Sequence, residues 1–227
     1  MRLLVYNVNC RNPDRDAVLD AIGGADADVA LLQEIALEWP AALDARFAAS
    51  YPHRVVHLAE RAPGGLAVLS KLPLDDDRVI PAPPDGWFPA QRVVVGGVQI
   101  LHVHLRPAVD ERGWATGYVS TPPLRLHQIQ TYVAELAPDP PVIVAGDYNE
   151  EPTGTTVAYL ASRGLVRVAP AGPKTWHYVR DGREHLALDI DHVMIDARLT
   201  ARDARVLDAG SSDHRPIVLD IEIERQA

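Results

Sequence analysis

The strongest constraint on the fold is a series of short apolar runs, rich in β-branched residues and bounded by turn-forming residues. Such runs are typical of β-strands. We expect strands at residues 3–8, 29–33, 66–70, 93–95, 98–105, 142–145, 190–195 and 217–223. No repeat or long linker interrupts the series, and 227 residues with 47% hydrophobic composition can bury a sizeable core. The sequence therefore predicts one domain spanning residues 1–227.

Three segments between these runs have apolar residues at helical spacing. We expect helices at residues 14–22, at residues 124–136, which Pro138 ends, and at residues 153–162, which end near Gly164. Many strands with a few intervening helices indicate an α/β fold, in which packed sheets carry helices on the outside.

The overall charge and the single cysteine narrow the class of protein. The formal net charge is −9, which disfavours a protein dedicated to gripping duplex DNA, because phosphate contacts dominate such binding. Cys10 alone cannot form an intramolecular disulfide, so a reducing compartment is expected. No apolar stretch has the length of a secretory signal or a membrane span. We expect a cytoplasmic protein and take a monomer as the default.

Polar side chains fall where the predicted strands end, in six places along the chain. These positions include Asn7, Glu34, His104, Asp147, Asn149, Asp191, Asp213 and His214. Each has an ordinary alternative when taken singly, such as a turn cap at Asp147 or a core histidine at His104. Buried polar groups are costly unless they find partners. The positions together therefore indicate that the sheets bring these side chains to one shared rim.

The motifs around these positions resemble the endonuclease/exonuclease/phosphatase superfamily, which includes DNase I-like nucleases, apurinic endonucleases, inositol-polyphosphate phosphatases and neutral sphingomyelinases. The motifs are Tyr6-Asn7, Gln33-Glu34, His104-Leu105, Gly146-Asp147-Tyr148-Asn149, Asp191-His192 and Ser212-Asp213-His214-Arg215-Pro216. Their order matches from residue 5 to residue 218. The resemblance implies a four-layered α/β/β/α sandwich of two packed mixed β-sheets flanked by helices, and a metal-dependent phosphoesterase activity.

The resemblance also implies a metal site and a histidine pair. Glu34 would be the main ligand of Mg²⁺ (or Mn²⁺), which prefers oxygen ligands, and Asp213 would add a second carboxylate. His214 would bind the scissile phosphate or act as a general base or acid. The carboxylate of Asp191 would position its ring and raise its pKa.

The remaining implied roles concern the attacking water and the phosphate. Asp147 would orient or deprotonate the water. Asn149 and Asn7 would donate hydrogen bonds to phosphate oxygens as charge develops. His104 would complete the phosphate site on the leaving-group side.

Two positions depart from the family's pattern. Several members carry an aspartate where this chain has Asn9, and a neutral amide cannot supply that charge, so a tightly held second metal is in doubt. His102 replaces a frequent asparagine and shares a strand face with His104. His102 is a candidate to touch substrate or to support His104.

Two proline-containing segments, residues 81–89 and 107–123, are predicted as long loops at a functional rim. In or beside the second lie Arg106, Arg112, Trp114, Tyr118 and Arg125. Arginine with aromatic residues suits an anionic, ring-bearing substrate, although a solvated loop is the alternative for each residue. Trp176 is similarly a candidate substrate contact or a core anchor. The run at residues 75–77, three aspartates, is expected to be a solvated turn.

The leading interpretation is hydrolysis of a phosphodiester or phosphomonoester by in-line attack of water. The substrate would be single-stranded nucleic acid, a nucleotide or a small phosphorylated metabolite. A sphingomyelinase-like or inositol-phosphatase-like enzyme is an alternative, as is an inactive binding module that keeps the fold. The acidic residues at the motif positions argue against the inactive module, and the chain lacks the histidine spacing of a zinc hydrolase.

Overall fold

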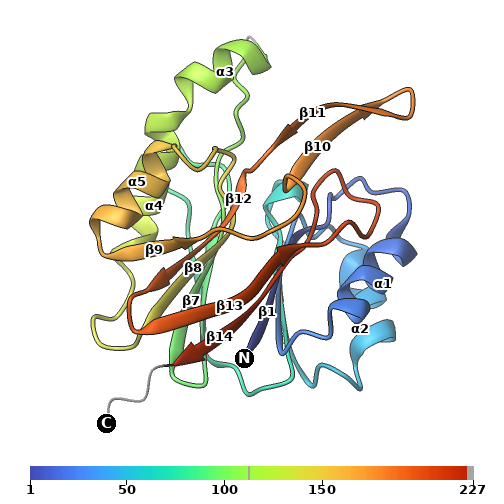
Figure 1. Ribbon diagram of the computed structural model, residues 1–227, viewed down its shortest axis with the longest axis vertical. Coiled ribbons are helices and arrows are strands. Elements are labelled where there is room, and N and C mark those ends of the chain that lie inside the picture. The colour runs from blue at the N-terminus through green and yellow to red at the C-terminus, as the bar shows by residue number, and fades with distance from the viewer. Residues whose placement is uncertain (112, 224–227) are drawn as a thin grey trace.

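Two six-stranded sheets face each other in the computed structural model, which describes residues 1–111 and 113–223 (Figure 1). The first sheet has the order β13 (Leu199–Val206), β14 (Ile217–Ile223), β1 (Arg2–Asn7), β2 (Val29–Gln33), β4 (Leu66–Ser70) and β3 (His53–His57). The second has the order β5 (Asp75–Ile80), β6 (Ala90–Val95), β7 (Val98–His104), β8 (Val142–Asp147), β12 (Asp191–Asp196) and β9 (Leu165–Val168). A separate hairpin joins β10 (Trp176–Arg180) to β11 (Arg183–Leu188).

Helices cover the outer faces of both sheets, which completes the four predicted layers (Figure 1). The helices are α1 (Arg15–Ala25), α2 (Trp39–Phe47), α3 (Trp114–Ser120), α4 (Pro122–Val133) and α5 (Thr155–Ser162), with one 3-10 turn at Ala62–Gly64. Alternate residues of β1 show the layering, because Leu4 packs under α1 and α2 while Leu3 packs between the sheets. Strands buried on both faces are apolar throughout, which explains the unbroken apolar runs of the sequence. The predicted α/β sandwich of two packed mixed sheets is confirmed.

The strand pairing brings several polar strand ends to one edge. Strands β1 and β2 are parallel and pair Asn7 with Gln33, and the parallel strands β7 and β8 pair His104 with Asp147. Strand β12 is antiparallel to β8 and begins with Asp191 opposite Asp147. The carboxyl ends of parallel neighbours lie at the same edge, so side chains far apart in sequence meet there.

A glycine makes the close contact between β7 and β8 possible at this edge. Gly146 has a φ of +143°, and a Cβ atom built there would lie 1.9 Å from the carbonyl oxygen of Val103. Only glycine has both the conformational freedom and the absence of a side chain that this position needs. The Gly-Asp motif is therefore a structural requirement for placing Asp147.

The three predicted helices are present as α1, α4 and α5, whereas α2 and α3 were not predicted. Helix α1 runs past the expected residue 22 through two glycines, and Asp26, in the left-handed region at φ +47°, ends it. Helix α2 was not predicted, although Pro40 at its start is a usual helix signal. Helix α3 lies within the segment at residues 107–123 that was expected to be a long loop.

Several strands with exposed or polar residues escaped prediction: β3, β5, β9, β10, β11 and β13. The solvated turn expected at residues 75–77 was wrong, because these residues begin β5 and its aspartates pair with neighbours. Asp76 pairs with Arg92 at 2.8 Å, and Asp77 with His57 at 2.8 Å. An edge strand needs only one buried face or none, so it lacks the apolar run on which the prediction depended.

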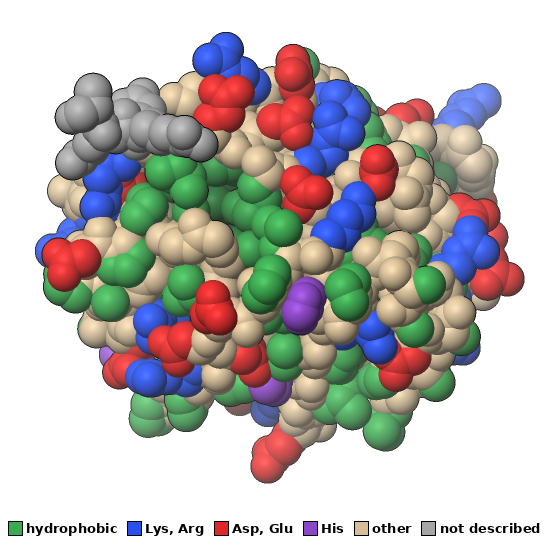
Figure 2. Space-filling model, turned by 90° about the horizontal axis from the view of Figure 1, so that it is seen from below, with side chains coloured by type: hydrophobic (Ala, Val, Ile, Leu, Met, Phe, Trp, Pro, Cys, Tyr) green, Lys and Arg blue, Asp and Glu red, His purple; other side chains and the backbone are tan. Residues whose placement is uncertain are grey.

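The surface away from the strand ends is charged in a mixed pattern. Figure 2 shows acidic and basic side chains intermingled over the face seen from below. A basic stripe of the kind that follows a nucleic-acid backbone is not visible on the described part of that face. Within residues 1–111 and 113–223, no helix is long and apolar enough to cross a membrane.

Candidate active site

A cavity of about 510 Å³ opens at the edge where the polar strand ends meet. Its walls include seven of the predicted site residues: Glu34, His104, Asp147, Asn149, Trp176, Asp213 and His214. This volume falls in the usual range for small-molecule sites. The edge of the two sheets thus forms a pocket in which the predicted polar residues are gathered.

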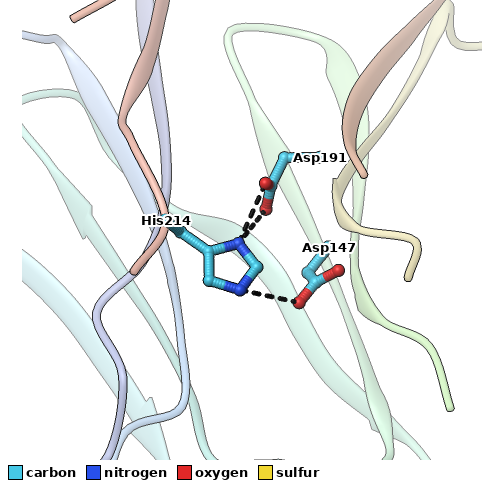
Figure 3. Close-up of side chains that lie close together, drawn as sticks. All are labelled: Asp147, Asp191 and His214. Carbon is cyan, nitrogen blue, oxygen red and sulfur yellow. Dashed lines mark hydrogen bonds and ion pairs between the residues drawn. The ribbon is translucent and has the colours of Figure 1, made fainter. Parts of the chain in front are cut away.

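His214 lies between two buried carboxylates (Figure 3). Nδ1 of His214 is 2.9 Å from Oδ2 of Asp191, and its Nε2 is 3.7 Å from Oδ2 of Asp147. Burial alone would lower the pKa of His214, but Asp191 and Asp147 outweigh it and raise the pKa to about 10. The two carboxylates thus favour the protonated form of the ring.

The hydroxyl of Thr175 helps to fix Asp191 and was not singled out from the sequence. Its Oγ1 accepts hydrogen bonds from the backbone N–H groups of Ile190 and Asp191, at 3.0 and 3.1 Å. On the other side, Ser212 donates to the carbonyl oxygen of Asn7 at 2.7 Å and holds the loop that carries His214. Both partners of the Asp191–His214 pair are thus anchored to the strand ends.

Asp147 is the most central carboxylate. Burial raises the pKa of Asp147 to about 6, with Asp191 raising it further and His214 and His104 opposing the shift. Its Oδ2 accepts a hydrogen bond from Asn7 at 3.0 Å and lies 3.5 Å from Nε2 of His104. A carboxylate with a pKa near neutrality is suited to accept a proton from water.

Asn7 connects two carboxylates instead of facing the cavity. It is 1% exposed, and its Nδ2 donates to Glu34 at 3.2 Å and to Asp147 at 3.0 Å. A side-chain amide has only two N–H groups, so both are engaged. The structure thus places Asn7 as a link between Glu34 and Asp147, and its contact with phosphate stays a prediction.

Glu34 is held in an unusual backbone conformation at the end of β2. Its φ of +62° lies in the left-handed region, which is strained for a residue other than glycine or asparagine. Its two carboxylate oxygens accept hydrogen bonds from Asn7 Nδ2 and, at 3.0 Å, from the backbone N–H of Cys10. Strain of this kind persists where the surroundings fix the residue, and it directs the Glu34 side chain to the cavity.

Asp213 is the second carboxylate of the expected metal site. Its Oδ1 accepts from Nδ2 of Asn9 at 2.8 Å, and its Oδ2 from Nε1 of Trp176 at 3.0 Å. Trp176 therefore orients Asp213 as well as lining the cavity. Asn9, where the family resemblance implied an aspartate, is a hydrogen-bond donor to Asp213.

The donor set of the cavity fits a hard divalent cation. Glu34 and Asp213 are partly exposed to the cavity, and each of their oxygens keeps a lone pair beyond its one hydrogen bond. Oxygen ligands of this kind suit Mg²⁺ or Mn²⁺. Asp147, Asp191 and His214 also lie within 4.8 Å of one another. A protonated His214 would offset one of the two carboxylate charges of that group.

Asn149 and His104 face the cavity with part of their hydrogen-bonding capacity already used. Asn149, at φ +52°, donates from Nδ2 to the carbonyl oxygen of Leu105 at 3.0 Å, which leaves one amide N–H. Nδ1 of His104 lies 2.9 Å from the carbonyl oxygen of Pro63. That contact directs Nε2 of His104 towards Asp147 and the cavity.

Two predicted substrate contacts lie outside the cavity wall. His102 is fully buried, and its Nε2 lies 2.6 Å from Nε2 of Gln33, which favours support of the site over contact with substrate. Arg106 packs its guanidinium 4.2 Å from the ring centre of Trp87 and donates to the carbonyl oxygen of Asp85 at 3.1 Å. Of the other arginines noted, Arg125 is buried against Glu150, and Arg112 lies outside the described residues.

Several cavity residues were missed from the sequence, notably Arg61, Trp87 and Phe88. The two aromatics lie in the proline-containing segment 81–89, which the sequence predicts to be a functional rim. Nothing in the sequence indicated that Arg61 lines the cavity, because a single arginine in a loop belongs to no recognisable motif. Its position follows from contacts between segments that sequence spacing does not reveal.

The chain matches the model of the Endonuclease/Exonuclease/phosphatase family over residues 4–214. No curated protein matches significantly. Among solved structures, an endonuclease/exonuclease/phosphatase from Beutenbergia cavernae superposes with a TM-score of 0.73 and 21% identity, covering 98% of this chain and 71% of that one. The 3′-5′ exonuclease NExo from Neisseria meningitidis gives 0.70 and 20%, covering 98% and 100%.

A further structural relative is the human Nocturnin catalytic domain with a bound sulfate anion, at a TM-score of 0.71 and 16% identity, covering 99% of this chain and 93% of that one. Identities this low establish the shared fold. The family match extends over nearly the whole length of the chain and includes every strand end that contributes to the cavity. The chain belongs to the Endonuclease/Exonuclease/phosphatase family.

Proposed function

We propose that the chain is a divalent-metal-dependent phosphoesterase that hydrolyses a phosphodiester or phosphomonoester by in-line attack of water. The observation that carries the proposal is the continuous set of contacts from Glu34 through Asn7 and Asp147 to His214 and Asp191 at the cavity floor. It combines a candidate cation ligand, a proton acceptor and a fixed positive charge within one pocket.

Glu34 and Asp213 would hold Mg²⁺ or Mn²⁺. When bound, the ion would neutralise negative charge on the phosphate and on the leaving oxygen. Trp176, Asn9, Asn7 and the Cys10 N–H hold the two carboxylates in place, so their oxygens need little rearrangement on binding. With Asn9 neutral, the site favours one well-held ion.

Asp147 would serve the proton transfer, and His214 would stabilise negative charge on the phosphate. Asp147, with its pKa raised by burial to about 6, orients the attacking water and accepts its proton. Protonated His214 presents a fixed positive charge to the phosphate, and Asp191 keeps the ring oriented. His104 and the free amide N–H of Asn149 provide further contacts with phosphate oxygens.

The substrate would be a small phosphorylated molecule or single-stranded nucleic acid. One structural neighbour is described as the 3′ phosphatase NExo from Neisseria bound to a product DNA hairpin, at 18% identity and a TM-score of 0.71. The net charge of −9 argues against extended duplex binding. An inactive binding module is disfavoured because Glu34, Asp147, Asn149, Asp191, Asp213 and His214 are all present.

The test is hydrolysis of bis(4-nitrophenyl) phosphate and 4-nitrophenyl phosphate with Mg²⁺, with Mn²⁺ and with EDTA. We expect turnover that needs metal and that falls at least 100-fold in Glu34→Gln. Glu60→Gln, an exposed residue, is the matched control and should retain the wild-type rate. Absence of turnover with either metal, or turnover that survives Glu34→Gln, would exclude the proposal.

A further inference from the structure

Part of the cavity wall is aromatic. Trp87 and Phe88 line it together with Trp114 and Tyr118 from α3. The two α3 side chains are 58% and 48% exposed, one helical turn apart, with ring centres 6.2 Å from each other. Large aromatic side chains exposed together at a cavity indicate a surface that a ligand covers.

Helix α3, which carries Trp114 and Tyr118, packs closely against the segment that precedes it. A Cβ atom built on Gly117 would lie 2.5 Å from Cα of Val109, so α3 rests directly on the preceding segment. Thr116 and Ser120 donate to the two carboxylate oxygens of Asp110 at 2.6 and 2.9 Å. The aromatic wall is therefore preformed, which lowers the entropic cost of binding a ligand.

The aromatic end connects directly to the reaction site. The ring of Phe88 packs 4.4 Å from the ring of His104, and Trp87 meets Phe88 edge to face at 6.2 Å. A phosphate held near His104 would therefore place its organic group against Phe88 and Trp87.

Two guanidinium groups lie beside Trp87. The Cζ atoms of Arg61 and Arg106 are 5.1 and 4.2 Å from the centre of its ring. The negative charges of Asp85 and Asp110 act on Arg106. Arg61 is exposed and lines the cavity, whereas Arg106 is held behind the ring by Asp85. Two like charges beside one ring are stabilised when an anion binds them.

Arg61 is fixed in position by the 3-10 turn that follows it. The N–H of Gly64 donates to the carbonyl oxygen of Arg61 at 2.8 Å, and the carbonyl oxygen of Gly65 accepts from Ile35 at 3.0 Å. A Cβ atom on Gly65 would lie 1.9 Å from the carbonyl oxygen of Ile35. The turn is thus pressed against the residue next to Glu34, which ties Arg61 to the proposed metal site.

We propose that this end of the cavity binds the aromatic ring of a small phosphate ester and that Arg61 contacts a second anionic group of the same molecule. The substrate class is therefore a ring-bearing compound with two phosphate groups, of the nucleoside bisphosphate type. This inference rests on the proposed phosphoesterase function and assigns its specificity to Trp87, Trp114 and Arg61.

The experiment compares three probes that share a phosphorylated ribose. Adenosine 3′,5′-bisphosphate has the ring and a second phosphate, adenosine 5′-monophosphate has the ring alone, and ribose 5-phosphate has neither. With Mn²⁺ we expect kcat/KM to fall at least fivefold at each step of this series. Isothermal titration of the bisphosphate, with Mn²⁺ and with EDTA, gives a binding readout that does not require turnover.

Variants assign the two parts of the subsite. Trp87→Leu should weaken both adenosine probes at least fivefold and ribose 5-phosphate less than twofold. Arg61→Gln should weaken the bisphosphate at least fivefold and the monophosphate less than twofold, while the exposed Arg163→Gln control changes neither. Trp114→Gln provides a second test of the aromatic wall at a solvent-exposed position, where loss of folding is not expected.

The outcomes separate this inference from the general function. Metal-dependent hydrolysis of bis(4-nitrophenyl) phosphate with no preference among the three probes would overturn the ring subsite alone. Faster phosphate release from dioleoyl phosphatidic acid vesicles than from the adenosine probes would also overturn it, because an acyl chain would then be the occupant. Tight bisphosphate binding without any hydrolysis would support the subsite and contradict the phosphoesterase proposal.

Discussion

Oδ2 of Asp191 lies 2.9 Å from Nδ1 of His214, at the start of β12 and just before β14, and both side chains are almost fully buried. The same ring faces Asp147 on its other side at 3.7 Å (Figure 3). A buried imidazole with carboxylates at both nitrogens retains its proton. This arrangement makes His214 a fixed cation next to a carboxylate that can accept a proton.

The first prediction concerns the charge of His214 in the metal-free protein. Because Asp191 raises the pKa of His214, Asp191→Asn should lower that pKa by at least one unit. We expect NMR titration of the ring resonances to show a protonated His214 at pH 8 in the wild type and a lower midpoint in the variant. The exposed carboxylate variant Asp203→Asn is the control. A neutral His214 at pH 8 in the wild type would contradict the charge assignment.

The second prediction concerns Asn9 and the number of metal ions. Asn9 donates to Asp213 at 2.8 Å, so Asn9→Asp would replace this hydrogen bond by repulsion between two carboxylates. Without metal, the variant should have a lower Tm than the wild type. With Mn²⁺ it should gain more in Tm than the wild type, because the cation relieves the repulsion. Equal thermal shifts with and without metal in both proteins would argue against a cation beside Asp213.

The third prediction concerns acid stability. Burial, with the charges of His104 and His57, lowers the pKa of His102 to about 3, below its ordinary value of 6.5. Between these values only the unfolded chain binds the proton, so the unfolding free energy falls as pH decreases, by up to about 1.4 kcal/mol per pH unit. His102→Gln should remove about 2 kcal/mol of the stability difference between pH 7 and pH 5.

Urea unfolding at the two pH values measures this difference. His185→Gln, at an exposed position of β11, is the control and should retain the wild-type difference. Some acid dependence should persist in His102→Gln, because burial also lowers the pKa of His192 to about 4. An unchanged difference in His102→Gln would show that the unfolded and folded proteins bind the proton of this residue alike.

The fourth prediction concerns the glycine that positions Asp147. In Gly146→Ala the new Cβ would meet the Val103 carbonyl oxygen, and the positive φ adds strain, so we expect a loss of at least about 3 kcal/mol in unfolding free energy. Gly24→Ala in α1, which meets no atom within 4 Å, should instead raise stability by about 0.5–1 kcal/mol. Chemical denaturation of both variants checks the contrast, and equal effects would refute the argument from the close contact.

The sequence was most informative where strands are buried on both faces. The expected strands at residues 29–33, 66–70 and 217–223 coincide with β2, β4 and β14, because their apolar runs end in turn residues. Edge strands such as β5 and β13 carry charged residues and escaped detection. The hairpin β10–β11 had a usable signal in Asp181-Gly182, where both residues have positive φ.

For the site, the sequence predicted which residues are gathered at the cavity better than it predicted the contacts that each of them makes. Six of the eight residues expected at one rim line one cavity, and the parallel strand pairs bring Asn7, Glu34, His104 and Asp147 to one edge. Which of them face substrate depends on burial and hydrogen bonding. Both side-chain N–H groups of Asn7 donate to carboxylates. Arg61 reaches the cavity because the turn that follows it packs against Ile35.

The most direct test of the account is the rate of metal-dependent phosphodiester hydrolysis by wild type and by Glu34→Gln. With Mn²⁺ and bis(4-nitrophenyl) phosphate, we predict turnover by the wild type that EDTA abolishes and that falls at least 100-fold in Glu34→Gln, whose fold is unchanged by circular dichroism. A wild-type protein that binds Mn²⁺ but hydrolyses no phosphate ester, or a Glu34→Gln variant with the wild-type rate, would contradict the account.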